Sequence, residues 1–392
     1  MDDDIQRIVD GLAGPEDAPA VVDPARRRAS AGDTAFVACL GAVLHARFGS
    51  ADVQRYRVAV YRLAHMLMFA PGQDALDHAL RLLAVPRSYD DSSDRWAAEV
   101  LACARTPREL DAVFADGRGE DGEDGEDGED GGDGGDSEGG AEELRNCLVN
   151  ELVLRGADLA DLPTASRWAA SAHRARHPLA WLPHALHSFE EEAEAISHSA
   201  DGSAGCATSR SFFRTRSIEV PAAQLPAPRA VEVTTRPLTR ALRTAVNTWE
   251  GEPNFRIEAR VFEFAATLYP SYVPSVLASL DLACLEGLDP QEKWVKTCEP
   301  GELWARLFWI SANDGTREEG AYGRLAAWRT LAALCGAPDG ASADEVGERA
   351  EACHWFTFDA ATDWFSQGVS GLAVATLTPD GRRLAVLAAT AD

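Results

Sequence analysis

The hydrophobic periodicity changes along this chain, and the change limits the folds that the chain can adopt. Up to about residue 199, apolar residues recur every three or four positions, as in amphipathic helices. From about residue 210, alternating segments enter, such as "AVEVTT" (230–235) and "HWFTF" (354–358). The pattern predicts an α+β protein that is predominantly α-helical.

Residues 1–115 and 141–199 form the predicted helical region. Asp33 is a suitable N-cap for one helix, and Ser50 for the next. Thr106 begins "TPRE", a capping box with Pro at the first helical position. Successive short helices with tight joints predict a helical bundle or a short solenoid, and no repeat of fixed period is visible.

Residues 116–140 interrupt the helical pattern with "GEDGEDGEDGED" and related Gly-acid units. From Asp116 to Glu143 the net charge is -13, half of the -26 that the chain carries. A G-x-G-x-x-G match occurs at 117–122, but it follows a helical segment, and the surrounding acid would repel a pyrophosphate. The acid spacing also misses an EF-hand loop. We interpret 116–140 as a disordered, self-repelling acidic insertion, called the acidic tract below.

Residues 210–392 form the predicted α+β domain, in which C-terminal helices pack on a small sheet that ends in a β-hairpin. "GLAVATL" and "RRLAVLAAT" flank "TPDG", where Pro379 suits a type I turn and Gly381 the left-handed position after it. Both hairpin strands are apolar on both faces, so we expect other elements to cover them. "FFRTRSIEV" (212–220) predicts a further strand.

The segment "NFRIEARVFEFAATLYP" (254–270) fits two periods. Ile257, Val261, Phe264 and Leu268 keep helical spacing over more turns than alternation holds, so we expect a helix up to Pro270. Further helices are expected near 273–287, 300–311, 319–335 and 343–352. The segment 199–211, rich in Ser and Gly, is the expected boundary between the two regions.

The composition predicts a soluble cytoplasmic protein. The chain opens "MDDDIQ", which is acidic where a signal peptide would be positive. The eight Cys are scattered, mostly among apolar residues, which indicates reduced and mostly buried thiols. The negative charge argues against nucleic acid and against anionic membranes as partners, and it favours a protein partner that carries positive charge.

Five of the nine His lie between residues 173 and 198. His173 and His177 are spaced i, i+4, and His184 and His187 are spaced i, i+3, so each pair could share a helix face and hold zinc. Neighbouring Arg and Pro residues oppose this geometry, and no H-E-x-x-H is present. A surface with several His is the favoured interpretation, with no metal.

Residues 210–243 hold seven Arg and only two acidic residues, a local excess of positive charge in an acidic chain. The candidate anion-binding or partner-binding residues are Arg210, Arg214, Arg216, Arg240 and Arg243. Ion pairing with acidic residues of the same chain is the alternative, and we favour it.

Several catalytic motifs are missing. Lys occurs only at 293 and 296, so no G-x-x-x-x-G-K-[ST] loop is possible, and no G-x-S-x-G elbow is present. A standard P-loop NTPase is therefore excluded, and we expect no cofactor. Catalytic triads assembled from distant residues remain possible, because chain order does not constrain them.

The last third of the chain resembles a known family. "GAYGRLAAWRTLAAL" (320–334), "WFTFD" and "DWF" (355–365) and "GLAVATLTPDGRRLAVLAAT" (371–390) resemble the uncharacterised family designated domain of unknown function 6183. The resemblance implies no activity and no catalytic residues. It also implies that the acidic tract is peculiar to this sequence.

The sequence is compatible with two classes of function. We favour a non-catalytic protein that acts through protein interaction, as an immunity protein or a scaffold does, because catalytic motifs are missing. The alternative is an enzyme, for example a metal-dependent hydrolase that uses the His-rich segment 173–198.

Overall fold

The computed structural model describes residues 2–10, 18–48, 54–83, 92–115, 135–172, 174–192, 229–288, 294–312, 320–365 and 370–391. These residues divide into two compact units, an N-terminal unit up to Ala180 and a C-terminal unit from Trp181 onward. The protein is α+β and mostly helical, as predicted. No helix in the described ranges is long and apolar enough to cross a membrane.

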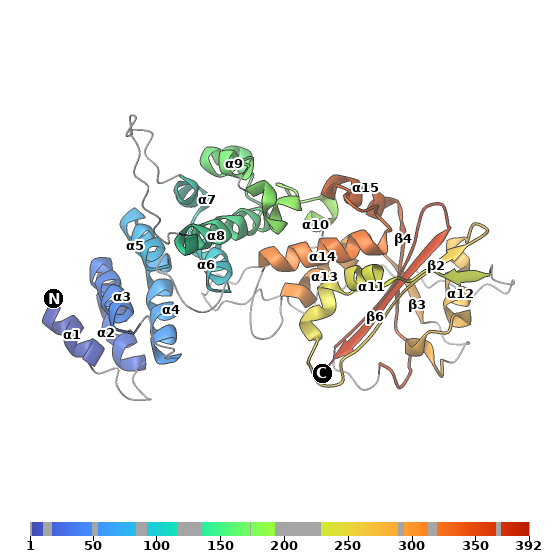
Figure 1. Ribbon diagram of the computed structural model, residues 1–392, viewed down its shortest axis with the longest axis horizontal. Helices are drawn as coiled ribbons and strands as arrows, with labels where there is room; N and C mark the ends of the chain where they lie inside the picture. Colours follow the sequence, from blue (N-terminus) through green and yellow to red (C-terminus); the bar gives the residue numbers. More distant parts are fainter. Residues whose placement is uncertain are drawn as a thin grey trace. The chain divides into compact units, whose positions relative to one another are not determined.

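The N-terminal unit consists of successive helices (Figure 1). The α-helices are α1 (Asp2–Asp10), α2 (Ala18–Ser30), α3 (Thr34–Phe48), α4 (Gln54–Phe69), α5 (Gln73–Leu83), α6 (Ser92–Ala104), α7 (Pro107–Leu110), α8 (Gly135–Leu154) and α9 (Pro163–Ala169). Short 3-10 helices are η2 (Asp111–Phe114), η3 (Leu159–Asp161), η4 (Arg174–Arg176) and η5 (Pro178–Trp181).

The helix starts follow the local sequence. The Asp33 carboxylate accepts a hydrogen bond from the Phe36 backbone N–H at 3.1 Å, which satisfies one of the unpaired amides at the start of α3. Thr106 and Glu109 form the predicted capping box at the start of α7. Helix α8 begins at Gly135, inside the segment that we assigned to the acidic tract. Residues 116–134 of the tract lie outside the described residues.

The C-terminal unit contains a six-stranded antiparallel sheet in the order β1-β2-β6-β5-β4-β3. Its strands are β1 (Ala230–Glu232), β2 (Arg256–Phe264), β3 (Val295–Cys298), β4 (His354–Phe358), β5 (Ser370–Leu377) and β6 (Arg383–Ala391). Strands β1 and β4 were predicted, and β3 was not. The strand predicted at 212–220 lies outside the described residues.

Helices of the C-terminal unit lie on both sides of this sheet (Figure 1). They are α10 (Ser188–Glu192), α11 (Arg236–Leu242), η7 (Thr244–Trp249), η8 (Pro270–Tyr272), α12 (Val273–Ser279), η9 (Ala283–Leu285), α13 (Pro300–Ala312), α14 (Gly320–Leu334) and α15 (Ala343–Ala352). The helix predicted over 273–287 ends earlier, at Ser279.

The closing hairpin is confirmed. The Gly381 N–H donates to the Thr378 carbonyl at 2.9 Å, and Gly381 has a φ of 66°. A Cβ at this position would lie 2.4 Å from the Leu268 carbonyl oxygen, so the turn requires glycine. The hairpin strands are buried on both faces, for example at Val374 and Leu387. Helices α11, α13 and α14 lie on one side and α12 on the other, as the apolar pattern predicted (Figure 1).

The helix predicted from Ile257 to Pro270 is wrong. Residues 256–264 form strand β2, which pairs along its length with β6, for example Val261 with Ala385. The helical spacing of apolar residues in this segment is a weak local signal. Strand β6, more than a hundred residues later in the chain, supplies hydrogen-bond partners for the backbone of this segment. This pairing outweighs the preference for a helix that the apolar spacing indicates.

Among the described residues, the two units divide after Ala180, and the expected boundary at 199–211 lies outside the described residues and stays a prediction. Segment 181–192 joins the C-terminal unit because its side chains are held there. Trp181 Nε1 donates to the Ala341 carbonyl at 2.9 Å. The Glu190 carboxylate binds Arg324 of α14, and both side chains are fully buried. The composition of 199–211 could not reveal these contacts.

Candidate functional site

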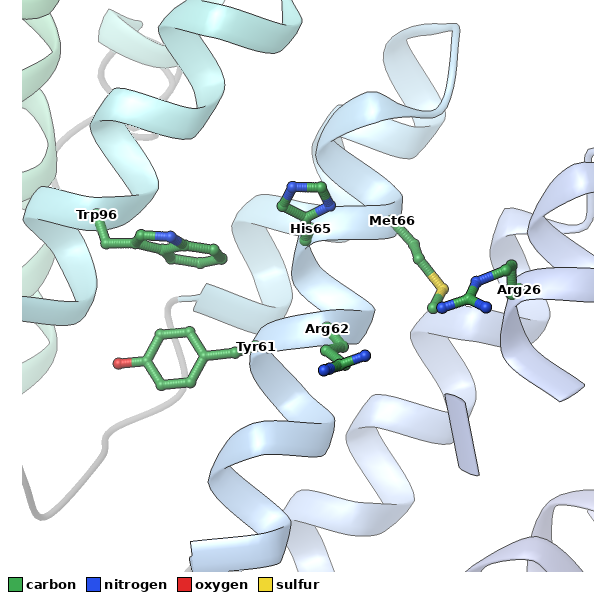
Figure 2. Close-up of a pocket in the computed structure, with 6 residues that line it drawn as sticks. All are labelled: Arg26, Tyr61, Arg62, His65, Met66 and Trp96. Atoms are coloured by element: carbon green, nitrogen blue, oxygen red, sulfur yellow. The ribbon is translucent and has the colours of Figure 1, made fainter. Parts of the chain in front are cut away.

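A cleft of about 420 Å³ lies in the N-terminal unit between α2, α4 and α6. Figure 2 shows that Tyr61, Arg62, His65 and Met66 come from α4. Arg26 of α2 and Trp96 of α6 complete the lining on opposite sides. None of these six lining residues is a carboxylate, a thiol or a Ser/Thr hydroxyl. The cleft therefore offers aromatic surface and positive charge.

Helix α4 positions the cleft because it is apolar on two faces. Its inner face packs into the core through Leu63 and Leu67, which are fully buried. A second row, Val58, Tyr61, His65 and Phe69, is spaced three or four residues apart and so lies on one outer face. We call this row the α4 stripe. Val58 is 37% exposed and Phe69 is 40% exposed, although large apolar side chains usually gain stability by burial.

The aromatic rings of the cleft contact one another. Tyr61 meets Trp96 edge to face, with ring centroids 5.0 Å apart and planes at 87°. His65 stacks on Phe69 at 4.6 Å and lies nearly parallel to Trp96 at 6.5 Å. These geometries are favourable for aromatic pairs and hold the rings in place. The result is an ordered aromatic surface that remains partly open to solvent.

Arginine side chains carry the charge of the cleft. Arg26 and Arg62 are both exposed. Arg26 lies 3.6 Å from Asp23, but both side chains are at least 60% exposed, and such surface pairs contribute little. Arg26 can therefore exchange Asp23 for an incoming carboxylate at small cost. The arrangement suits a ligand that combines apolar groups with negative charge.

The described metal candidates belong to different units. His177 belongs to the N-terminal unit, whereas His184 and His187 belong to the C-terminal unit. Residues 182–187 are not helical, so His184 and His187 do not share a helix face. His173 and His198 lie outside the described residues. Across the residues that the structure describes, no group of three or more potential ligands could hold a metal ion.

The His177 ring is used in hydrogen bonds. Its Nδ1 accepts the Leu179 backbone N–H at 3.2 Å, which places the ring proton on Nε2. Nε2 lies 2.8 Å from the Glu143 carboxylate and donates to it. Glu143 also accepts from Arg95 Nε at 2.9 Å. Neither ring nitrogen then has a lone pair directed at a metal.

His187 is packed against aromatic rings in the C-terminal unit. Its ring centroid lies 4.2 Å from that of Phe189 and 5.8 Å from that of Trp328. Nδ1 is 3.1 Å from the Ser188 hydroxyl, which itself donates to Glu351 at 2.6 Å. His184 is exposed. These contacts give His187 a structural role in packing.

The arginine candidates are only partly described. Arg210, Arg214 and Arg216 lie outside the described residues, so a common surface of all five stays a prediction. Arg240 is exposed on α11, and Arg243 follows that helix. Arg243 lies 3.7 Å from Glu250, in line with the favoured interpretation of pairing within the chain.

One buried ionic cluster was not recognised in the sequence. Glu190 accepts from Arg324 Nε at 2.8 Å and from its Nη2 at 2.9 Å. Trp328 Nε1 donates to the same carboxylate at 2.9 Å, and the His187 backbone N–H donates at 2.8 Å. Both ions are fully buried with satisfied hydrogen bonds, so the cluster holds segment 181–192 on α14.

Most described thiols are poor nucleophiles. Burial raises the pKa of Cys335 to about 11 and that of Cys298 and Cys353 to about 12. Burial also raises the pKa of Cys147 and Cys284. The thiolate is the reactive form, so these five side chains are inert near neutral pH. Cys39 and Cys103 are exposed.

A family model matches residues 19–126 and 132–392, which is most of the chain. The chain belongs to the DUF6183 family. This family is described as one of unknown function. The match extends far beyond the C-terminal third that carries the resemblance, and it breaks only at 127–131, within the acidic tract. No curated protein and no solved structure matches the chain.

The α4 stripe could have been recognised in the sequence. Val58, Tyr61, His65 and Phe69 keep helical spacing on the face opposite the one that predicts the core contact. Trp96 and Arg26 could not have been assigned to the same site, because they come from other helices.

Proposed function

We propose that the protein is non-catalytic and cytoplasmic, and that it acts by binding a protein partner at the cleft between α2, α4 and α6. The observation that carries this proposal is the α4 stripe, which the described residues of the N-terminal unit leave partly exposed and of which Tyr61 and His65 line the cleft. Contiguous apolar surface rimmed by polar residues is typical of interaction sites. An immunity protein or a scaffold would use its surface in this way.

The chemistry of the described polar clusters supports a non-catalytic role. Glu143 and His177 bind each other, and Glu190 is enclosed by donors, so neither carboxylate is open to a substrate. The six lining residues include no Ser, Thr, Cys, Asp, Glu or Lys, which are the commonest covalent nucleophiles, and the His65 and Tyr61 rings contact other aromatic rings. Free, buried thiols suit a reducing compartment.

Site-specific photo-crosslinking tests this proposal. A photoreactive amino acid replaces Arg62 in the cleft or, as a matched control, Arg81, which is exposed on α5 of the same unit. The two full-length proteins are irradiated in lysate of the source cells. We expect a discrete adduct with another protein from position 62 and none from position 81. Equal labelling at the two positions, or no adduct at 62, contradicts a partner-binding cleft.

A further inference from the structure

We infer that the partner presents an acidic amphipathic helix to this cleft. The inference rests on the proposed function and adds the chemistry of the bound segment. The α4 stripe runs from Val58 to Phe69. At about 1.5 Å per residue it is about 16 Å long, the length of three helical turns. A helix that lies along it would place apolar residues at i, i+3 or i+4, and i+7 against the stripe.

The walls of the cleft favour this orientation. Trp96 of α6 stands on one side of α4 and Arg26 of α2 on the other, so a segment along α4 contacts both (Figure 2). Trp96 offers a large ring that stays partly exposed beside Tyr61. Aromatic side chains with this partial exposure are common anchors in interfaces.

Local charge selects an acidic segment. The cleft is lined by Arg26 and Arg62, and none of its six lining residues is acidic. The chain as a whole carries -26, which favours a basic partner at long range. At physiological ionic strength, charges beyond about 8 Å are largely screened. Arg26 and Arg62, together with the exposed Asp23 that lies 3.6 Å from Arg26, leave a local excess of positive charge at the cleft.

The acidic tract of this chain is a weaker candidate for the cleft. It can supply carboxylates to Arg26 and Arg62. It contains no apolar side chain between residues 116 and 140, so it cannot cover Val58 or Phe69. A segment that satisfies both the stripe and the arginines needs apolar anchors as well as negative charge.

Fluorescence anisotropy with four synthetic peptides tests the inference on the full-length protein. The first peptide, of about 18 residues, has Leu at i, i+3 and i+7 spacing and Glu elsewhere, which makes one apolar helix face. The second has the same composition in shuffled order. The third replaces every Glu with Lys. The fourth repeats Gly-Glu-Asp, as the tract does.

We expect the first peptide to bind at least about tenfold more tightly than each of the others, a difference of about 1.4 kcal/mol. Arg62→Glu and Val58→Asp should each weaken its binding at least about tenfold, through charge and through the apolar stripe respectively. Arg81→Glu, the control on α5, should leave the affinity unchanged. Circular dichroism checks that each variant is folded.

The other outcomes separate the inference from the proposed function. Equal or tighter binding of the Lys peptide overturns the acidic partner and leaves the partner-binding cleft standing. Equal binding of the shuffled or Gly-Glu-Asp peptide overturns recognition of a helix face. No binding of any peptide, with crosslinks still formed at position 62, overturns the inference alone. A crosslink that joins position 62 only to the acidic tract, or only to a second copy of this chain, overturns the inferred partner helix, because the tract or the second copy then occupies the cleft.

Discussion

The two units place their apolar and charged side chains differently. In the C-terminal unit, strands β5 and β6 are buried on both faces, and the Glu190–Arg324 pair is fully enclosed. In the N-terminal unit, α4 buries one apolar face and leaves the α4 stripe open. The exposed apolar residues described in the C-terminal unit are dispersed: Val231 lies on β1, Tyr269 in the loop before η8 and Trp309 on α13.

The difference concerns how much apolar surface a single element leaves exposed. In the C-terminal unit, the β5–β6 hairpin and the Glu190–Arg324 pair are enclosed by the unit itself. Among the described residues, the N-terminal unit keeps the α4 stripe partly exposed on one helix face. The family match spans both units, and the proposed binding cleft lies in the N-terminal one.

The largest predicted effect is in the C-terminal unit. Glu190→Ala leaves the Arg324 guanidinium buried without its counter-ion. We expect the free energy of unfolding to fall by about 3–5 kcal/mol, measured by urea unfolding followed through tryptophan fluorescence. Glu191→Ala, at the exposed neighbouring position, should change it by less than about 0.5 kcal/mol. Equal effects of the two changes would refute the structural role of Glu190.

A capping box starts one helix in each unit, and we expect its loss to lower the free energy of unfolding by a similar, intermediate amount in both units. The Thr106 hydroxyl caps α7 and the Ser342 hydroxyl caps α15 in the same way. Thr106→Ala and Ser342→Ala should each lower the free energy of unfolding by about 1 kcal/mol. Glu348→Ala, at an exposed position inside α15, is the control. A loss confined to one unit would show that tertiary contacts already fix the other helix start.

The α4 stripe predicts a small effect on stability. Val58 is 37% exposed, so Val58→Asp should change the free energy of unfolding by less than about 0.5 kcal/mol. Leu63→Asp, on the buried face of the same helix, should unfold the N-terminal unit. Thermal unfolding by circular dichroism distinguishes the two. A loss above about 2 kcal/mol for Val58→Asp would mean that the stripe belongs to the core.

The acidic tract predicts the smallest effect. Deletion of residues 119–134 shortens a connection and leaves α8 intact from Gly135. Loop length changes the closure entropy slowly, so the thermal midpoint should shift by less than about 2 °C, with or without calcium. Differential scanning calorimetry measures it. A calcium-dependent gain in the full-length protein that the deletion removes would reveal a calcium site in the tract.

Much of the fold could be predicted where the signal is local. The turn at Thr378–Gly381 follows from Pro379 and from a left-handed glycine, and the capping boxes at Thr106 and Ser342 follow from hydroxyl and carboxylate spacing. The α4 stripe also has a local signal, because helical spacing places Val58, Tyr61, His65 and Phe69 on one face. These features depend on residues within a few positions of one another.

Three features depend on tertiary packing and could not be inferred from local sequence. Segment 256–264 is a strand because β6 supplies hydrogen-bond partners for its backbone. Segment 181–192 joins the C-terminal unit because Arg324 supplies a counter-ion for Glu190. The cleft exists because Trp96 and Arg26 reach α4 from two other helices. In each case the deciding partner is distant in the chain, and local periodicity carries no information about it.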